Sequence, residues 1–158
     1  MNTQIMELGP IAVIGIEGFC TKNTNVVSEL WKTSNVNFSD VAQLGMKEKD
    51  GSYVGFWGLM SDVTRNYLPW DNDYSTGYYL AGIEVYNDTP VPDGWTKWIL
   101  PRRTYLVIEI ENNKYQETLW YGIKEEIPKL GYKLSGAVCD YTKPKTGENF
   151  LFFPISKI

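Results

Sequence analysis

Histidine is absent from all 158 residues of this chain. Its absence excludes a Ser-His-Asp triad, a Cys-His nucleophile pair and imidazole ligation of a metal ion. Cysteine is also scarce: Cys20 and Cys139 stand far apart and form no Cys-x-x-Cys motif. That usage is typical of a reduced cytoplasmic protein with two free thiols. We therefore expect neither a metal ion nor a cofactor.

Long apolar runs and concentrated positive charge are missing too. No run approaches the roughly 18 residues of a membrane helix, and the first eight residues lack the basic start and apolar stretch of a signal peptide. The net charge is −4, and the pair Arg102-Arg103 is too short a basic run to indicate nucleic-acid binding. Phosphate-binding loops, the serine nucleophile elbow and the zinc-protease helix motif are absent. These absences favour a protein that binds neither membrane nor nucleic acid directly.

Aromatic residues are what the chain has in abundance. They make up 15% of it, with six tryptophans and eleven tyrosines, while the hydrophobic (43%) and charged (22%) fractions are those of a globular protein. So many rings with a polar tip suit the wall of a binding site. The length predicts a single domain over 1–158, with halves at about 1–85 and 86–158.

Hydrophobic periodicity predicts the order strand, helix, strand, strand, which occurs twice. In the first half the strands lie at about 11–16, 53–59 and 78–85, and Val27, Leu30, Trp31 and Ser34 form one face of the helix. In the second half the strands lie at 104–110, 133–141 and 149–156, with a helix at 115–127. The segments 60–77 and 86–101 have no period and are predicted loops.

Two such units predict an α+β fold. We expect duplicated βαββ units with pseudo-two-fold symmetry, in which one or two antiparallel sheets surround a central cleft and the helices lie on one side. Strand alternation places Tyr79 and Ile83 on the helix-packed face and Tyr78 and Glu84 on the other. We expect the ligand groove on the face that carries Glu84.

Four stretches carry a resemblance to a known family: YYLAGIEV at 78–85, VPDGW at 91–95, WILPRRTYLVIEI at 98–110 and TLWYGIKEEIPKLGY at 118–132. In this order and spacing they resemble the GyrI-like, or AraC effector-binding, small-molecule domain over residues 9–158. The resemblance implies two βαββ repeats and a central cleft for amphipathic, often cationic compounds. The chain resembles the stand-alone members of this family. The first expected strand begins near residue 10, which leaves no room for a helix-turn-helix segment.

The resemblance also implies a pocket glutamate in a Glu-x-Tyr pattern on the penultimate strand. Tyr141 fits the tyrosine of that pattern, but Cys139 stands where the glutamate would be and Asp140 lies one place off. A step of one residue turns a side chain to the opposite face of a strand. Glu84 and Asp140 therefore both remain candidates for the acidic contact in the pocket.

The candidate ligand-binding residues are aromatic or acidic and lie on the predicted strands and their connections. Each has a plain structural alternative: Glu84 would face solvent, Trp57 and Trp120 would be core, and Trp95 and Trp98 would cover a sheet edge. The complete set is Trp57, Tyr78, Glu84, Trp95, Trp98, Tyr105, Trp120, Asp140, Tyr141 and Phe152. Several aromatic faces and one carboxylate would suffice to hold a cation.

Three functions follow, and the first is favoured. The chain would bind a small, lipophilic, cationic or aromatic compound. Alternatively it would hydrolyse a reactive cyclopropane-bearing compound, with Glu84 or Asp140 positioning water; the Cys139 departure weighs against this enzyme. A third possibility is a topoisomerase-inhibitor-like protein that contacts a partner through an exposed aromatic loop at 92–98. The sequence leaves open whether the protein is a monomer or a dimer.

Overall fold

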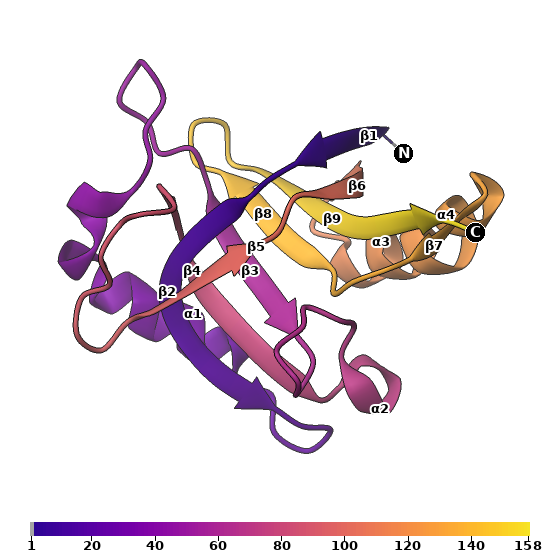
Figure 1. Cartoon of the computed structure of the whole chain (residues 1–158), viewed down its shortest axis with the longest axis horizontal. Coiled ribbons are helices and arrows are strands. Elements are labelled where there is room, and N and C mark those ends of the chain that lie inside the picture. Colours follow the sequence, from indigo (N-terminus) through magenta and orange to yellow (C-terminus); the bar gives the residue numbers. More distant parts are fainter. Residues whose placement is uncertain (1) are drawn as a thin grey trace.

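The computed structural model describes residues 2–158, and within this range nine strands form one antiparallel sheet with short helices beside it (Figure 1). The strands are β1 (Thr3–Leu8), β2 (Ile11–Cys20), β3 (Phe56–Ser61), β4 (Gly77–Val85), β5 (Thr96–Leu100), β6 (Arg103–Glu109), β7 (Tyr132–Leu134), β8 (Cys139–Lys143) and β9 (Glu148–Lys157). The helices are α1 (Val27–Val36), α2 (Asp71–Tyr74), α3 (Tyr115–Tyr121) and α4 (Ile127–Lys129), with a π-helical turn, Gly122–Glu126, joining the last two. The α+β prediction is confirmed.

The strand order relates the two halves of the chain. The sheet runs β1-β6-β9-β8-β3-β4-β2-β5, and β7 pairs with β9 outside this path. Each strand of the first half has a counterpart in the second: β1 corresponds to β5, β2 to β6, β3 to β8 and β4 to β9. When the counterparts are exchanged, the same strand order is obtained in reverse. The middle of the sheet is therefore the β3–β8 pair, where Gly58 stands opposite Asp140.

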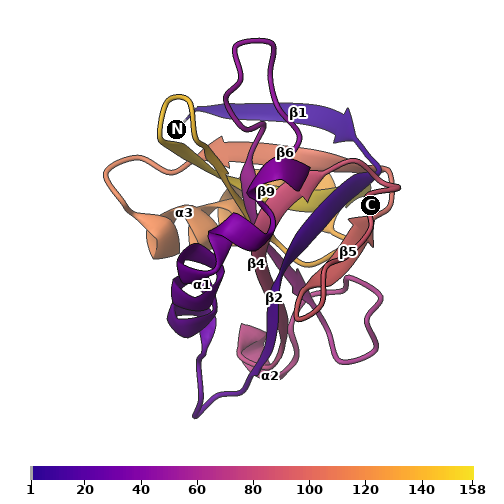
Figure 2. The same cartoon turned by 90° about the vertical axis from the view of Figure 1, so that its left-hand side faces the viewer.

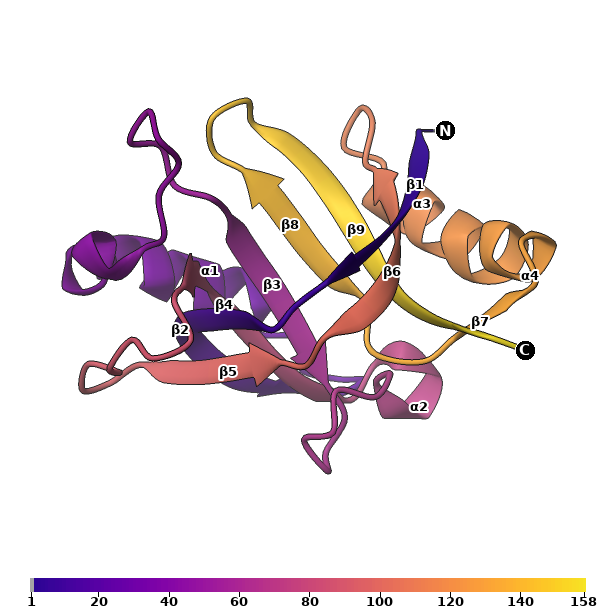
Figure 3. The ribbon, with the colours of Figure 1, turned by 45° about the horizontal axis from the view of Figure 1, so that its top comes forward.

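The sheet curls until its two ends meet. β1 lies at one end, yet only Gly9 and Pro10 separate it from β2 near the other end. β5 and β6 are joined in the same way by Pro101 and Arg102. These two links cross in close contact: Gly9 has a φ of 128°, and a Cβ there would come within 2.6 Å of the Arg102 Cα. The inner face of the sheet is thus enclosed by the sheet itself (Figure 3).

Alternate residues of seven strands fill this inner face. The cluster contains Trp57, Trp98, Tyr105 and Phe152 together with smaller apolar side chains. Phe152 makes edge contacts to Trp57 and Tyr105, with ring centroids 4.9 and 5.6 Å apart. The inner face is therefore the main core and not an open groove.

Both long helices pack on the outer face of the sheet, as predicted. Leu30 of α1 packs against Tyr79 and Ala81 of β4, and Ile127 at the end of the second helix packs against Leu106 and Phe153. Figure 2 shows α1 and α3 on the same side of the sheet. The space between them, above β3 and β8, is where the candidate site lies.

Several boundaries differ from the sequence prediction. β5 falls in the segment 86–101, which was expected to be a loop, and β1 precedes the first expected strand. Prolines at 10, 90, 92 and 101 interrupt the pattern beside these two strands. The strand expected at 53–59 starts at Phe56, and the one expected at 133–141 is divided into β7 and β8. That division occurs at Ser135 and Gly136, where a Cβ on Gly136 would lie 2.6 Å from the Arg103 guanidinium.

Candidate functional site

A cavity of about 600 Å³ lies between α1 and α3 on the outer face of the sheet. Its floor is formed by β3, β4 and β8, and its walls by the two helices and the segment that contains α2. Ligand pockets for drug-sized molecules have volumes of ~300–1,000 Å³. The cavity is thus large enough for such a molecule, and it lies at the junction of the two halves.

Asp140 stands on the floor of this cavity. β8 turns Asp140 and Thr142 toward the helices and Cys139 toward the inner core, and Val138, just before β8, also lines the cavity. The Tyr79 hydroxyl donates a hydrogen bond to Asp140 Oδ2 over 2.9 Å, and the Trp31 indole N–H donates to the Tyr79 hydroxyl over 2.9 Å. A chain of three polar groups therefore joins α1, β4 and β8.

The carboxyl of Asp140 is poorly hydrated. Burial raises its pKa from 3.8 to about 6, against the opposing effect of hydrogen bonds from Tyr79 and from the Gly58 backbone N–H. The Tyr79 hydroxyl, itself buried, has a pKa well above its usual range because burial and the neighbouring Asp140 charge disfavour its ionised form. At neutral pH the floor of the cavity therefore carries one negative charge with little water to screen it.

Gly58 makes this arrangement sterically possible. It faces Asp140 across the β3–β8 pair, and a Cβ there would lie 1.9 Å from the Tyr79 hydroxyl and 2.4 Å from Asp140 Oδ2. No real Cβ tolerates such distances. The missing side chain at position 58 leaves the room in which the tyrosine and the carboxylate meet.

Aromatic side chains form much of the cavity wall. Trp31 comes from α1, Tyr115 from α3, and Trp70 and Tyr74 from the segment around α2. The Trp70 N–H donates to the Tyr78 carbonyl over 2.9 Å, so both tryptophans have their polar atoms bonded to protein and turn carbon surfaces to the cavity. The pKa of Tyr115 is raised, first by burial and then by the Asp140 charge.

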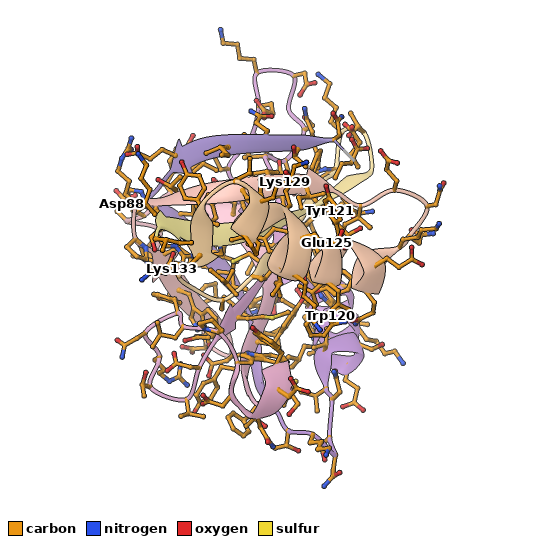
Figure 4. The ribbon with its side chains drawn as sticks, turned by 90° about the vertical axis from the view of Figure 1, so that its right-hand side faces the viewer. Asp88, Trp120, Tyr121, Glu125, Lys129 and Lys133 are labelled. Atoms are coloured by element: carbon orange, nitrogen blue, oxygen red, sulfur yellow. The ribbon has the colours of Figure 1, made fainter. Side chains whose placement is uncertain are left out.

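Trp120 lies at the mouth of the cavity and not in its wall. Its ring makes an edge contact with Tyr74, with centroids 5.8 Å apart, and the Lys124 ammonium lies 5.0 Å from its centroid. Tyr74 and Trp120 stay 40% and 36% exposed. Figure 4 shows Trp120 on the lower side of the second helix in that view, apart from Lys129 and Lys133. Two exposed rings from opposite halves of the chain thus meet beside the opening.

Glu84 and Trp57 lie outside the cavity. They occupy the opposite face of the sheet, where the Trp57 indole N–H donates to Glu84 Oε1 over 2.7 Å and Trp57 is 3% exposed. Burial raises the pKa of Glu84, partly offset by this hydrogen bond. The expectation of a groove on the Glu84 face was wrong, because the curled sheet fills that face with its own side chains.

The remaining aromatic candidates on the strands belong to the same inner core. Tyr78 packs at its margin with the Arg65 guanidinium 4.0 Å from its ring centroid. Tyr141 packs against Trp57, with ring centroids 4.7 Å apart, and is also one of the residues that line the cavity. Trp98 donates its N–H to Glu17 Oε1 over 2.7 Å. The inner-core positions among the candidates are Trp57, Tyr78, Trp98, Tyr105, Tyr141 and Phe152.

The segment 92–98 does not offer the exposed aromatic surface expected of a protein-contact loop. Trp95 is buried against Ile14 and Val85, and its N–H donates to Asp40 Oδ2 over 3.2 Å. Trp98 belongs to β5 and points into the inner core. Both rings cover parts of the sheet, as in the alternative in which Trp95 and Trp98 have a structural role and do not bind a ligand.

Asp140 is thus the one acidic candidate that lies in the cavity, and most of the aromatic residues around it are not among the candidates. Tyr79 lies on the helix-packed face of its predicted strand and Trp31 on the apolar face of its predicted helix. Trp70 and Tyr74 lie in a segment without period. One signal was available in the sequence: the Tyr79 hydroxyl falls on a strand face that is predicted to pack against a helix. Polar groups on such a face need partners, which suggests an internal site.

Comparison with known proteins decides the family. The sequence model of the Cass2 family, "integron-associated effector binding protein", matches residues 4–150. The chain belongs to this family. The match confirms the resemblance to effector-binding domains that the four sequence stretches carry. A sequence search found no curated protein that matches this chain.

Solved structures share its fold. The SAV2435 protein bound to tetraphenylphosphonium superimposes with a TM-score of 0.67 at 14% identity, over 99% of this chain and 94% of that one. The C-terminal domain of EcmrR gives a TM-score of 0.62 at 11% identity, over 99% and 98%. The integron cassette protein VCH_CASS2 from the mobile metagenome of Vibrio cholerae gives 0.56 at 15% identity, over 98% and 95%. At these identities the likeness extends to the fold alone.

Three further findings concern metal binding, membrane spanning and the cysteines. Within residues 2–158 no group of three or more cysteine or acidic side chains is arranged to hold a metal ion. No helix in the same range is long and apolar enough to cross a bilayer. Cys20 and Cys139 are both buried free thiols.

Proposed function

We propose that this protein binds lipophilic, aromatic monocations in the cavity between α1 and α3. The observation that carries the proposal is the position of Asp140, the one charged side chain among the described residues that line the cavity. A carboxylate in such surroundings is poorly solvated by water and pairs strongly with a cation that reaches it. A dispersed organic cation loses little hydration on entry, so its charge pairs with Asp140 at small cost.

The aromatic walls provide the second part of the recognition. A cation near a tryptophan or tyrosine face gains ~0.5–2 kcal/mol per ring, and Trp31, Tyr79 and Tyr115 stand around Asp140. Flat apolar groups of the ligand would lie against Trp70 and Met60. The relative SAV2435, whose structure contains tetraphenylphosphonium, supports this ligand class through the shared fold.

Calorimetric titration with tetraphenylphosphonium at pH 8 tests the proposal. The wild-type protein should bind the probe saturably, and Asp140→Asn should weaken binding by at least about thirtyfold, since truncating one partner of a buried charge pair costs ~2–5 kcal/mol. Glu84→Gln is the matched control, because it removes a partly buried carboxylate from the opposite face. Equal affinity in the wild type and Asp140→Asn would overturn the proposal.

A second candidate function follows from the acid–base character of Asp140. A general base works best with a pKa near the working pH, and the pKa of this carboxyl is about 6. The alternative is hydrolysis of a reactive cyclopropane-bearing compound, with Asp140 accepting a proton from the attacking water. Mass spectrometry would detect product heavier by one water, lost in Asp140→Asn; a bound compound that is recovered unchanged excludes this activity for that compound.

A further inference from the structure

The cavity continues past Asp140 toward a polar end. Thr142 lies two residues further along β8 on the same face, which corresponds to ~7 Å along a strand. It stands opposite Asn149 of β9, and its hydroxyl donates to Asn149 Oδ1 over 2.7 Å. The Asn149 backbone carbonyl accepts the Ile110 N–H over 2.8 Å. Strand pairing on both sides therefore fixes Asn149 at this end.

Hydrogen-bonding capacity is left over there. The Thr142 contact uses only the carbonyl oxygen of the Asn149 amide, and its Nδ2 has no partner within residues 2–158. Asn113 and Gln116, just before and within the first turn of α3, line the same end, and both residues are exposed, so their amide groups are open to solvent and to a bound molecule. Each such amide carries two N–H donors. This end of the cavity is therefore rich in donors available to a bound molecule.

The opposite end is more apolar. Beyond Val138 the cavity is lined by Pro69, Trp70, Leu134 and Ala137, and the Trp70 N–H is already bonded to a backbone carbonyl. Asn25 and Ser28, just before and within the first turn of α1, are the polar lining residues on this side, and the Asn25 side-chain oxygen accepts the Val27 N–H over 3.0 Å. The backbone N–H of Ala137 is also occupied, by the Tyr67 carbonyl over 2.8 Å. Asp140 lies between this apolar, aromatic end and the amide-lined end.

We infer that the natural ligand is an amphipathic monocation whose aromatic part and uncharged polar part lie on opposite sides of the charge. The polar part carries a hydrogen-bond acceptor, such as a carbonyl or ether oxygen, roughly 7–9 Å from the cationic centre, because the Asn149 amide that donates to it lies two residues along and one strand across from Asp140. The inference rests on the proposed function, in which Asp140 holds the cation. It adds a direction within the cavity and a chemical group that tetraphenylphosphonium does not have.

Two matched triphenylphosphonium probes test the inference. One carries a plain alkyl chain, and the other a chain of equal length with a carbonyl at the stated distance from phosphorus. In the wild type the carbonyl probe should bind about two- to tenfold more tightly, the range expected for one hydrogen bond. Asn149→Ala should abolish this difference while the alkyl probe keeps its wild-type affinity. Glu84→Gln is the control and should leave the difference unchanged.

The outcomes separate the two proposals. If both probes bind the wild type equally and Asp140→Asn weakens both, the polar subsite is refuted and the cation site stands. If Asn149→Ala retains the full preference for the carbonyl probe, Asn149 is not the donor and the inference fails. If neither probe depends on Asp140, the proposed function fails. The comparison of the two probes in the wild type does not depend on the folding of any variant.

Discussion

The Tyr79 hydroxyl donates a hydrogen bond to Asp140 Oδ2 over 2.9 Å, and this bond joins the two halves of the chain at the cavity floor. Tyr79 belongs to β4 of the first half and Asp140 to β8 of the second, with β3 between them in the sheet. Because the Tyr79 oxygen accepts the Trp31 N–H, its own proton is directed at the carboxylate. Asp140 is thus held in place by groups that leave it ionisable.

Affinity for a permanent cation should depend on pH through Asp140. The pKa of its carboxyl is about 6, so the group is ionised at pH 8 and mostly protonated at pH 5. Binding of tetraphenylphosphonium should therefore weaken by about tenfold between pH 8 and pH 5, since roughly one molecule in ten is then ionised. Titrations at several pH values measure this, and the same series on Asp140→Asn should be nearly flat. A steep pH dependence in that variant would assign the effect to another group.

Protein stability should fall as Asp140 ionises, whereas affinity for the cation should rise. The pKa of this carboxyl is about 6 in the folded chain and 3.8 ordinarily, so the folded state binds the proton more tightly and stability falls as pH rises between these values. At pH 8, Asp140→Asn should raise the free energy of unfolding by up to about 3 kcal/mol. Near pH 4 the gain should largely vanish. Urea denaturation at both pH values measures it, with Glu111→Gln in an exposed turn as the control for loss of one charge.

A methyl group at position 58 should disrupt the Tyr79–Asp140 contact. In Gly58→Ala the new Cβ would lie 1.9 Å from the Tyr79 hydroxyl, and overpacking of this kind costs ~1–3 kcal/mol. Removing that hydroxyl in Tyr79→Phe should relieve part of the clash. The double variant should therefore be less destabilised than the sum of the single variants. Denaturant melts of all four proteins give the coupling; strictly additive losses would show that the two positions do not interact.

The thiol of Cys139 should be unreactive in the folded protein. Cys139 lies in the inner core, and burial raises the pKa of its thiol to about 11, which leaves almost no thiolate at pH 8. A colourimetric thiol reagent should modify neither Cys139 nor the equally buried Cys20 until denaturant is added, and should then modify both. Cys20→Ser would isolate the signal from Cys139. Rapid stoichiometric labelling of the native protein would contradict the enclosed inner face.

The element order was predictable from the sequence because it depends on local periodicity. The apolar stripe of α1 and the alternation in β4 and β6 each predict one element and one buried face, and those elements are present. β1 and β5 were missed because edge strands beside prolines carry weak patterns. Their pairing with the opposite half is a long-range relation that no local window contains.

The site was harder to predict for a reason of topology. Alternation correctly separates Tyr79 from Glu84, but it does not say which of the two faces is enclosed. That depends on the two-residue links at Gly9-Pro10 and Pro101-Arg102, which force the sheet to curl and fill the face that carries Glu84 and Trp57. The cavity therefore lies between the helices. Asp140 was retained as a candidate by its chemistry, against the register suggested by the resemblance.

The contact between Tyr74 and Trp120 should govern how fast a ligand leaves the cavity. The two rings come from opposite halves of the chain and meet at its mouth, and an aromatic pair of this geometry contributes ~0.5–1.5 kcal/mol. Trp120→Ala should therefore raise the dissociation rate of tetraphenylphosphonium by about two- to tenfold, with a smaller effect on the association rate. Stopped-flow tryptophan fluorescence measures both rates. Lys129→Ala, on the exposed surface of the same helical segment, is the control and should change neither rate (Figure 4). An unchanged dissociation rate in Trp120→Ala would mean that the ring contact does not restrain the ligand.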